Sequence, residues 1–301
     1  MSITGQNLSI VIVTLKSEDV IFKCLESIDS KIPIFIVENS NNLQFKKSVE
    51  KRYNNVSCVL TARNLGMGSG NNLGIRLVET DYVLILNPDV ILEVNTLKEL
   101  MLASEKIKDF AILSPISIKS EYPNYKLYQN DKPDIRNNFP FKVRSVDGYA
   151  MLFNKKEVNK ILEKESINKE KNYFDENFFM YLENDDLCKR ITENRGDIFV
   201  TPKAKINHLG AKAVNEKYRD EVEFSRNWHW MWSKFYFNKK HYGLFQALSK
   251  ISINFLSSVI KYLFYSITLN NYKKNIYKMR LAGAANSIMG KPSWFRPNIK
   301  N

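Results

Sequence analysis

Cysteine is scarce in this sequence. Among its 301 residues only Cys24, Cys58 and Cys188 are cysteines, and they are odd in number and far apart. This pattern excludes a small disulfide-stapled domain and has no zinc-type spacing, so it favours a reduced, cytoplasmic setting. The N-terminus also lacks a basic stretch followed by an apolar core. Its apolar run at residues 8–13 is only as long as a strand, so we expect no signal peptide.

Acidic residues are absent from the last quarter of the chain. Of the 45 lysines and arginines, 13 follow Glu223, whereas all 32 acidic residues lie at or before it. The net charge of +13 therefore sits entirely in the tail, which predicts an anionic partner for that part alone. Lipid head groups and nucleic acid are the two candidates. The tail carries no recognisable nucleic-acid motif, so we expect no nucleic-acid partner.

The tail is predicted to be helical from about residue 215, and its segment 244–269 is mostly apolar. Its polar positions recur every three or four residues, at Gln246, Lys250, Asn254, Ser257 and Lys261. This narrow polar stripe and its two lysines disfavour a spanning helix. The helix either packs on the catalytic domain or lies on a membrane surface, and we favour the membrane. Nearby aromatics form an interfacial belt or a core: Trp228, Trp230, Trp232, Phe235, Tyr236 and Phe237.

Short apolar runs alternate with helix-like stretches over the first 118 residues. Strands are expected at 8–14, 33–37, 56–60, 82–86 and 110–118, and helices at 18–28, 43–52, 70–80 and 95–107. This alternation is typical of βαβ units with a parallel sheet. Further strands are expected at 146–153 and 197–201, a helix at 184–194 ending at Gly196, and a long loop at 121–142. We expect an α/β domain in residues 1–215 and a helical, basic extension in 216–301.

Asp89 follows one of the expected strands directly. The apolar run Tyr82–Leu86 leads into Asn87-Pro88-Asp89, and proline cannot continue a central strand. Asp89 is thereby left at the carboxyl end of a buried strand, where open α/β sheets bind ligands. A carboxylate in that place can hold a divalent cation against a phosphate.

Three weaker signals lie at other expected strand ends. Residues 64–72, Asn-Leu-Gly-Met-Gly-Ser-Gly-Asn-Asn, form a glycine-rich turn that is either a flexible loop or an anion site before a helix. Glu38 can accept hydrogen bonds from a ribose or a base. Considered by itself, however, its position favours a helix cap or turn residue. Gly148, after Asp147, can let a substrate pass close to the backbone.

Three acidic residues lie close together at residues 183–186. Glu183, Asp185 and Asp186 fall at an expected helix start, after the apolar aromatic run 178–182. Carboxylates at a helix start can be simple caps. Carboxylates crowded beside aromatics should instead have raised pKa values, which suits a general base, and we favour this second interpretation. His208, after a later strand, is structural or a second metal ligand beside Asp89.

Taken in order, these motifs resemble family 2 glycosyltransferases, and within them the bacterial rhamnosyltransferase-like branch. The resemblance covers roughly residues 8–215. It is carried by the following segments: residues 9–14, Val37-Glu38-Asn39-Ser40, the turn at 64–72, Asn87-Pro88-Asp89, Asp147-Gly148, residues 174–190 and His208.

The resemblance implies a GT-A fold and inverting transfer of a sugar from a nucleotide-sugar donor. Thr14 and Glu38 would contact the nucleoside. The donor would further be bound by Asn64, Gly66, Gly70, Asn71, Asn87, Asp89 and Gly148. Mg²⁺ or Mn²⁺ would be held by Asp89, with His208 as a candidate ligand.

One departure concerns the base. Many relatives carry Asp where this chain has Asn184, which cannot take a proton. The role then falls to Asp185, Glu183 or Asp186, and the sequence does not choose among them.

We therefore expect a glycosyltransferase acting on a glycan or lipid-linked glycan acceptor in surface polysaccharide assembly. Its expected location is cytoplasmic, peripheral on the inner face of the membrane through the basic tail. Two alternatives remain: a sugar-1-phosphate nucleotidyltransferase, and a non-catalytic membrane-binding protein on a degenerate transferase domain.

Overall fold

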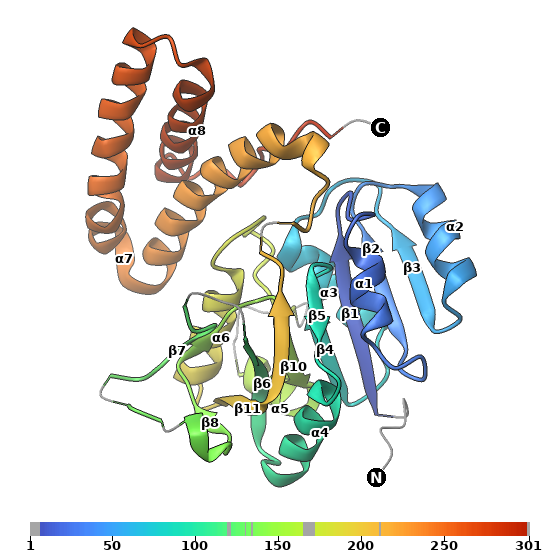
Figure 1. Cartoon of the computed structure of the whole chain (residues 1–301). Coiled ribbons are helices and arrows are strands. Elements are labelled where there is room, and N and C mark those ends of the chain that lie inside the picture. The colour runs from blue at the N-terminus through green and yellow to red at the C-terminus, as the bar shows by residue number, and fades with distance from the viewer. Residues whose placement is uncertain are drawn as a thin grey trace. The chain divides into compact units, whose positions relative to one another are not determined.

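The computed structural model describes residues 7–118, 122–129, 131–133, 135–164, 172–210 and 212–299. The chain divides into two compact units (Figure 1). The first comprises Met1–Asp175 and Asn184–Asn215, and the second comprises Glu176–Glu183 and Glu216–Asn301. The segment 176–183, which we expected in the first domain, thus groups with the C-terminal residues.

A nine-stranded sheet forms the centre of the first unit. Its strands run in the order β3 (Val56–Leu60), β2 (Ile34–Glu38), β1 (Leu8–Thr14), β4 (Tyr82–Leu86), β10 (Ala150–Asn154), β6 (Phe110–Ser117), β11 (Asp197–His208) and β5 (Val90–Leu92), with β8 (Phe141–Lys142) beside β11. Strands β1 to β4 are parallel, and β6 is parallel to β11, whereas β10, β5 and β8 run antiparallel to their neighbours. The mostly parallel sheet predicted from the sequence is confirmed.

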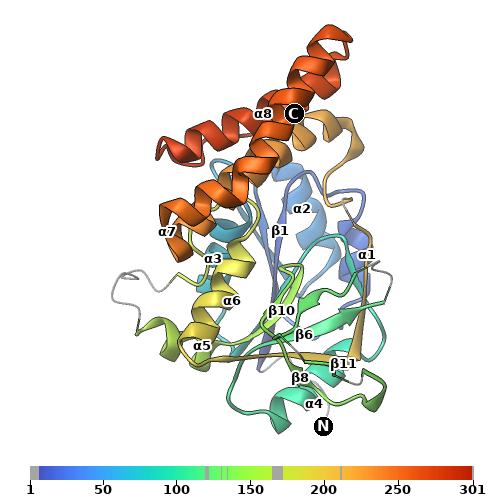
Figure 2. The same ribbon diagram turned by 90° about the vertical axis from the view of Figure 1, so that its left-hand side faces the viewer.

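Side chains alternate across this sheet and build a core on each face. Ile10 and Ile12 of β1 join the core covered by α1 (Ile21–Glu26), α2 (Leu43–Arg52) and α4 (Thr96–Lys106). Val11, between them, joins the core covered by α3 (Met67–Leu77), α5 (Lys155–Leu162) and α6 (Glu183–Glu193). Strands buried on both faces read as continuous apolar runs, which is why the sequence showed them so clearly. Figure 2 shows the two helical layers on either side of β1.

The expected loop 121–142 contains short elements where it is described. Strand β7 (Tyr125–Lys126) pairs with β9 (Ser145–Val146) in a separate small sheet, and a 3₁₀ turn, η1, covers Ile135–Asn137. Strand β11 is also longer than predicted, so His208 is its last residue rather than a residue after it.

Two glycines are required by close contact rather than by conformation. A Cβ on Gly74 of α3 would lie 2.3 Å from Cγ1 of Val11, so the helix can approach β1 only at a glycine. A Cβ on Gly196 would lie 2.4 Å from Cδ1 of Ile161. The left-handed residue that ends α6 is Arg195, with φ of 65°, and not Gly196 as we expected.

Helices make up most of the second unit. Helix α7 (Arg219–Ile267) follows a 3₁₀ turn, η2 (Glu216–Tyr218), and is interrupted at Gly243, whose φ of 83° few other residues adopt. Helix α8 covers Asn271–Ile288. Trp228, Trp232 and Phe235 are buried, so the aromatics around α7 belong mainly to a core rather than to an interfacial belt.

The aromatic run before α6 explains why the segment 176–183 belongs to this unit. Phe178 meets Tyr236 edge to face, with ring centroids 4.9 Å apart. Tyr181 meets Trp230 in the same way at 5.5 Å. The hydroxyl of Ser233 donates to the carbonyl of Met180 at 2.8 Å. Residues 178–181 therefore pack against α7.

Candidate functional site

Asp89 lies where the sequence placed it, beyond the carboxyl end of β4, and it is buried. Two backbone hydrogen bonds fix its surroundings. The amide of Asn87 donates to the carbonyl of Tyr149 at 2.9 Å, and the amide of Leu209 donates to the carbonyl of Asp89 at 3.0 Å. The carboxylate is thus held between the ends of three strands: β4, β10 and β11.

His208 lies beside Asp89, as expected for a pair of ligands. Its Nε2 is 3.5 Å from Oδ1 of Asp89, which is longer than a normal charge-assisted hydrogen bond. Tyr149 stacks on the imidazole with ring centroids 4.1 Å apart, so the ring orientation is fixed by packing. Two ligand atoms of the right kind therefore face one point.

This pair fits a divalent cation that also binds the substrate. Within the described residues, three or more His, Cys, Asp or Glu side chains do not gather into a metal centre. Mg²⁺ commonly takes one or two protein ligands and completes its shell with water and substrate phosphates. Asp89 and His208 suit that arrangement, in which the ion stays only while the phosphates are bound.

Buried polar atoms without partners gather at the same edge of the sheet. Within the described part of the chain, four nominated donor-site residues have a buried side-chain oxygen that forms no hydrogen bond: Thr14, Asn71, Asn87 and Asp89. Thr14 and Asn87 end or follow neighbouring parallel strands, and Asn71 is the fifth residue of α3. Since buried polar groups are normally paired, these oxygens suit a polar ligand.

Glu38 has a more local role than the resemblance implied. It is buried, and its two carboxylate oxygens accept hydrogen bonds from the amides of Ser40 and Asn42 at 2.8–3.1 Å. The hydroxyl of Ser40 also donates to it. Glu38 thus supports the turn after β2, and a ribose or base would have to share it with these donors.

The glycine-rich turn begins its helix earlier than predicted. Helix α3 starts at Met67, and Gly66 is its N-cap with φ of 84°. The side-chain Nδ2 of Asn39 donates a hydrogen bond to the carbonyl of Gly66 at 3.1 Å. Asn64 accepts from the amide of Gly66 at 3.0 Å. A Cβ on Gly70 would lie 3.0 Å from Val13. Gly66 itself offers no side chain to cap the helix, and a helix N-terminus favours an anion.

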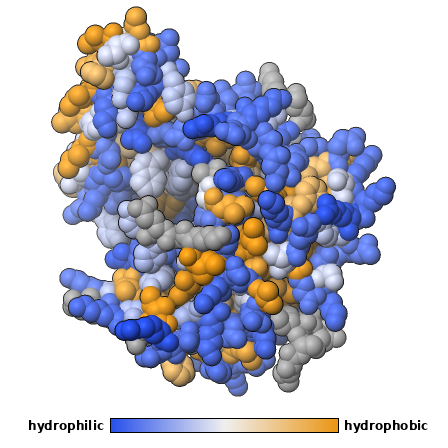
Figure 3. Space-filling view, viewed as in Figure 1, coloured by the Kyte–Doolittle hydropathy of each residue, from blue (hydrophilic) through white to orange (hydrophobic). Residues whose placement is uncertain are grey.

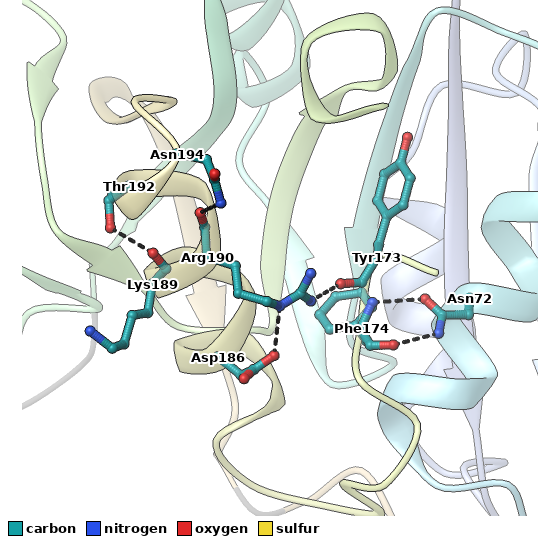
Figure 4. A network of polar contacts seen from close by, with 8 residues as sticks. All are labelled: Asn72, Tyr173, Phe174, Asp186, Lys189, Arg190, Thr192 and Asn194. Atoms are coloured by element: carbon teal, nitrogen blue, oxygen red, sulfur yellow. Dashed lines mark hydrogen bonds and ion pairs between the residues drawn. The ribbon is translucent and has the colours of Figure 1, made fainter. Parts of the chain in front are cut away.

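Asp186, one of the three candidate bases, is held in a buried ion pair. Its side chain is fully buried, and its Oδ2 lies 2.8 Å from Nε of Arg190 (Figure 4). Arg190 also donates to the carbonyl of Tyr173. Beside them, Asn72 forms two hydrogen bonds with the backbone of Phe174, at 2.8 and 2.9 Å. Asp186 therefore holds Arg190 of the same helix, and Arg190 joins α6 to the segment at Tyr173.

The other two candidates lie at the start of the same helix. Asp185 accepts from Nζ of Lys126 at 2.7 Å, and its side chain is 17% exposed. Glu183 is the first residue of α6, directly after Tyr181 and Leu182, which both have left-handed φ values of 70° and 66°. Two such residues in a row are strained, and strain of this kind is concentrated at functional sites.

Asp147 has a perturbed carboxyl, although the sequence did not mark it as a candidate base. Burial raises the pKa of its carboxyl, the charge of Asp185 raises it further, and Lys126 and His208 oppose the shift. A raised pKa is thus found at Asp147, which we had not considered as a base. Its signal in the sequence was only an Asp-Gly pair at a strand start. Lys126, inside the long loop, gave no signal.

Gly148 and Asn184 meet across the site. A Cβ on Gly148 would lie 3.2 Å from Cβ of Asn184. The side-chain Nδ2 of Asn184 donates a hydrogen bond to the carbonyl of Val146 at 2.9 Å. Asn184 thus fixes the backbone next to Asp147. The structure places Asp147, Asp185 and Lys126 in one group with His208, the residue that the sequence had paired with Asp89.

The chain matches known proteins in both sequence and structure. The model of glycosyl transferase family 2 matches residues 9–168. A curated relative, the low-salt glycan biosynthesis hexosyltransferase Agl10 of Haloferax volcanii, is 26% identical over 197 residues, which are 61% of this chain and 61% of the relative. The match thus leaves more than a third of that relative uncovered.

Solved structures share the fold at low identity. GalNAc-T7 with UDP, GalNAc and Mn²⁺ has a TM-score of 0.54 at 13% identity, over 67% of this chain and 43% of that one. S. aureus TarS 1–349 in complex with UDP has a TM-score of 0.52 at 14% identity, over 95% and 92% of the two chains. These likenesses confirm the GT-A-like α/β fold.

Proposed function

The chain belongs to glycosyl transferase family 2, and on that premise we propose that it transfers a hexose, rhamnose-like or another, from a nucleotide-sugar donor to a glycan. The observation that carries the proposal is the set of buried oxygens on Thr14, Asn71, Asn87 and Asp89 that form no hydrogen bond within the described residues. A donor with a polar nucleoside and a diphosphate would supply partners for such atoms.

Relatives support the choice of donor and reaction. The H. volcanii relative is a hexosyltransferase of glycan biosynthesis, which suggests a hexose and a glycan product here. Proteins of the same fold contain UDP, in one case with Mn²⁺, which suggests a nucleoside diphosphate and a divalent cation. Asp89 and His208 are the residues that would hold Mg²⁺ or Mn²⁺.

The proposed reaction is a single displacement with inversion. The acceptor hydroxyl oxygen attacks the anomeric carbon while the bond to the diphosphate breaks, and the electron pair leaves with the diphosphate. A bound cation would neutralise the charge that develops there. The hydroxyl proton passes to a carboxylate at the start of α6, and Glu183 and Asp185 are the candidates left by the buried pair of Asp186. Asp147 interacts electrostatically with Asp185, Lys126 and His208.

The proposed acceptor is a saccharide or a lipid-linked saccharide at the inner face of the cytoplasmic membrane. The support is the basic C-terminal tail, which has no acidic residue after Glu223. A peripheral enzyme there would meet its acceptor at the surface of the lipid.

The test is donor turnover by the purified full chain. A panel of nucleotide sugars is screened with Mn²⁺ by thermal shift, and the best donor is then assayed for release of nucleoside diphosphate. We expect Asp89→Asn to lower turnover at least ~100-fold, as loss of a metal-holding carboxylate should. Asp109→Asn is the matched control, since Asp109 is an exposed acid just before β6.

Two results would contradict the proposal. Full turnover by Asp89→Asn in the presence of EDTA would exclude the cation role of Asp89. No thermal shift and no turnover with any donor would favour a non-catalytic protein. Glu183→Gln and Asp185→Asn, each assayed with donor and acceptor, identify the base as the variant that loses transfer but still binds donor.

A further inference from the structure

The second segment of α7, residues 244–267, has its hydrophobic side chains on the outside. At about 100° per residue they fall on one side of the helix, and we call this side the outer face: Phe245, Leu248, Ile253, Leu256, Ile260, Leu263, Phe264 and Ile267. Their exposure runs from 39% at Leu248 to 88% at Phe245. Figure 3 shows hydrophobic residues along the outer edge of this segment, at the upper left of the view. A water-facing helix normally has the opposite pattern.

The inner side of the same segment is small and partly polar. Ala247, Ile251 and Ser258 are buried. Asn254 accepts a hydrogen bond from Nζ of Lys234 in the first segment of α7 at 2.6 Å, and the hydroxyl of Ser258 donates to the carbonyl of Asn254 at 2.7 Å. The polar stripe seen in the sequence is therefore used in part for packing, which turns the wider apolar surface outward.

Basic side chains lie beside the outer face. Lys250 and Lys261 are exposed on its flank, Lys250 between Leu248 and Ile253, and Lys261 between Ile260 and Leu263. Lys261 and Arg280 both approach the ring of Tyr277, at 5.4 and 5.5 Å from its centroid. Lys273 lies 5.3 Å from the centroid of Tyr265. Apolar surface and positive charge thus occur together, with no acidic residue after Glu223 to offset them.

We propose that the outer face of residues 244–267 lies in the plane of an anionic lipid bilayer. Its apolar side chains enter the boundary between head groups and acyl chains, and the flanking lysines contact lipid phosphates. This deepens the proposed function by naming the surface that meets the membrane. It rests on that function only for the choice of acceptor, since lipid binding needs no sugar transfer.

A spanning helix fits the packing less well. By length and composition α7 with η2 is the one helix within the described residues that could cross a membrane, and 17% of its most apolar window is buried. One side of the segment, however, is already packed through Ala247, Ile251 and Asn254. Spanning would also carry the basic start of α8, with Lys273 and Lys274, across the lipid.

A second copy of the chain is a less suitable partner for the outer face. Two copies would bring like charges together around Lys250 and Lys261, and like charges oppose association. An anionic surface offers both apolar contact and opposite charge.

The experiment is sedimentation of the full chain with vesicles. One set contains phosphatidylcholine with 30% phosphatidylglycerol, and the other contains phosphatidylcholine alone. We expect at least tenfold stronger binding to the anionic set at low salt, with most of that difference lost in 0.5 M NaCl. The triple variant Leu256→Gln/Ile260→Gln/Phe264→Gln should lower binding at least tenfold, since glutamine keeps the helix but not the apolar face.

The matched control replaces three exposed leucines on helices of the first unit: Leu43→Gln/Leu77→Gln/Leu102→Gln. It should bind vesicles as the wild type does. Release of nucleoside diphosphate from a soluble donor is measured in all variants and should stay unchanged, so failure of lipid binding and failure of transfer are separate results.

Three outcomes would overturn the inference. Undiminished binding by the outer-face variant would place the lipid contact elsewhere. Concentration-dependent dimerisation that the outer-face variant loses, without vesicle binding by the wild type, would assign the face to a second copy. Protein from cell membranes that resists extraction at pH 11 would indicate a spanning helix.

Discussion

Removing the carboxylate of Asp186 should lower the stability of the folded protein. It should not block a chemical step directly. Asp186 is fully buried and pairs with Arg190, whose side chain is 11% exposed. In Asp186→Ala the guanidinium keeps its charge and its bond to the carbonyl of Tyr173 but loses the ion pair with Asp186. Breaking a buried pair from one side costs about 3–5 kcal/mol. For a domain of this size that corresponds to a fall in Tm of roughly 6–20 °C.

A double variant separates the charge from the packing. In Asp186→Leu/Arg190→Met both charges are replaced by apolar side chains of similar length, a change that is often neutral or stabilising. It also removes the donor to Tyr173, which costs about 1 kcal/mol. We therefore expect its Tm to lie much closer to the wild type than that of the single variant.

The assay is thermal unfolding combined with donor turnover at a temperature where every variant is folded. Glu193→Ala is the control, since Lys189 and Glu193 form an ion pair on the same helix and Glu193 is 56% exposed. Its effect should stay below about 1 kcal/mol. An unchanged Tm in Asp186→Ala, or loss of all transfer in a double variant that keeps its Tm, would refute the structural role and return Asp186 to the candidate bases.

Two pH effects follow from buried groups. Burial lowers the pKa of His229 to about 3, so its contribution to stability is present above its unfolded value near 6.5 and is lost as pH falls toward 3. At pH 5 the loss is roughly 2 kcal/mol. Urea unfolding at pH 7 and 5 should show it, and His229→Asn should flatten the difference while His241→Asn leaves it in place. For Asp147 the pKa is raised, so folding is favoured at low pH and that gain is lost as pH rises. Asp147→Asn should therefore raise Tm at pH 7–8 but not at pH 4, and an unchanged Tm at both would contradict the raised pKa.

The first unit could be predicted well because its strands are buried on both faces. The expected strands at 8–14, 56–60 and 82–86 match β1, β3 and β4 residue for residue. Asp89 could be placed because Pro88 ends the strand by simple chemistry. The partnership of Asp89 with His208 depends on the antiparallel pairing of β5 with β11, which sets His208 opposite Val90, and no local pattern in the sequence contains that pairing.

The packing of the second unit was harder to predict because the sequence does not show which apolar residues form its core and which lie at its surface. In the sequence Phe178 and Tyr181 belong to an aromatic run beside the acidic cluster, yet in the structure they pack against Tyr236 and Trp230 of α7. Asn254 looks like part of a solvent-facing stripe, yet it accepts a hydrogen bond from Lys234. Periodicity locates a helix face but does not say which face turns inward.

The choice of base depends on a turn that the sequence does not reveal. Tyr181 is fixed by its contact with Trp230, and it and Leu182 adopt left-handed conformations just before α6 begins. That turn sets which way the first residues of the helix point, and Asn184 thereby faces Gly148 instead of carrying a proton-accepting oxygen there. A carboxylate moved by one position along a helix rotates by about 100°. Asp185 therefore points differently from Asn184, and it accepts a hydrogen bond from Lys126. If Asp185 is the base, the acceptor must approach from the side of Lys126, and Lys126→Met should impair acceptor use more than donor hydrolysis.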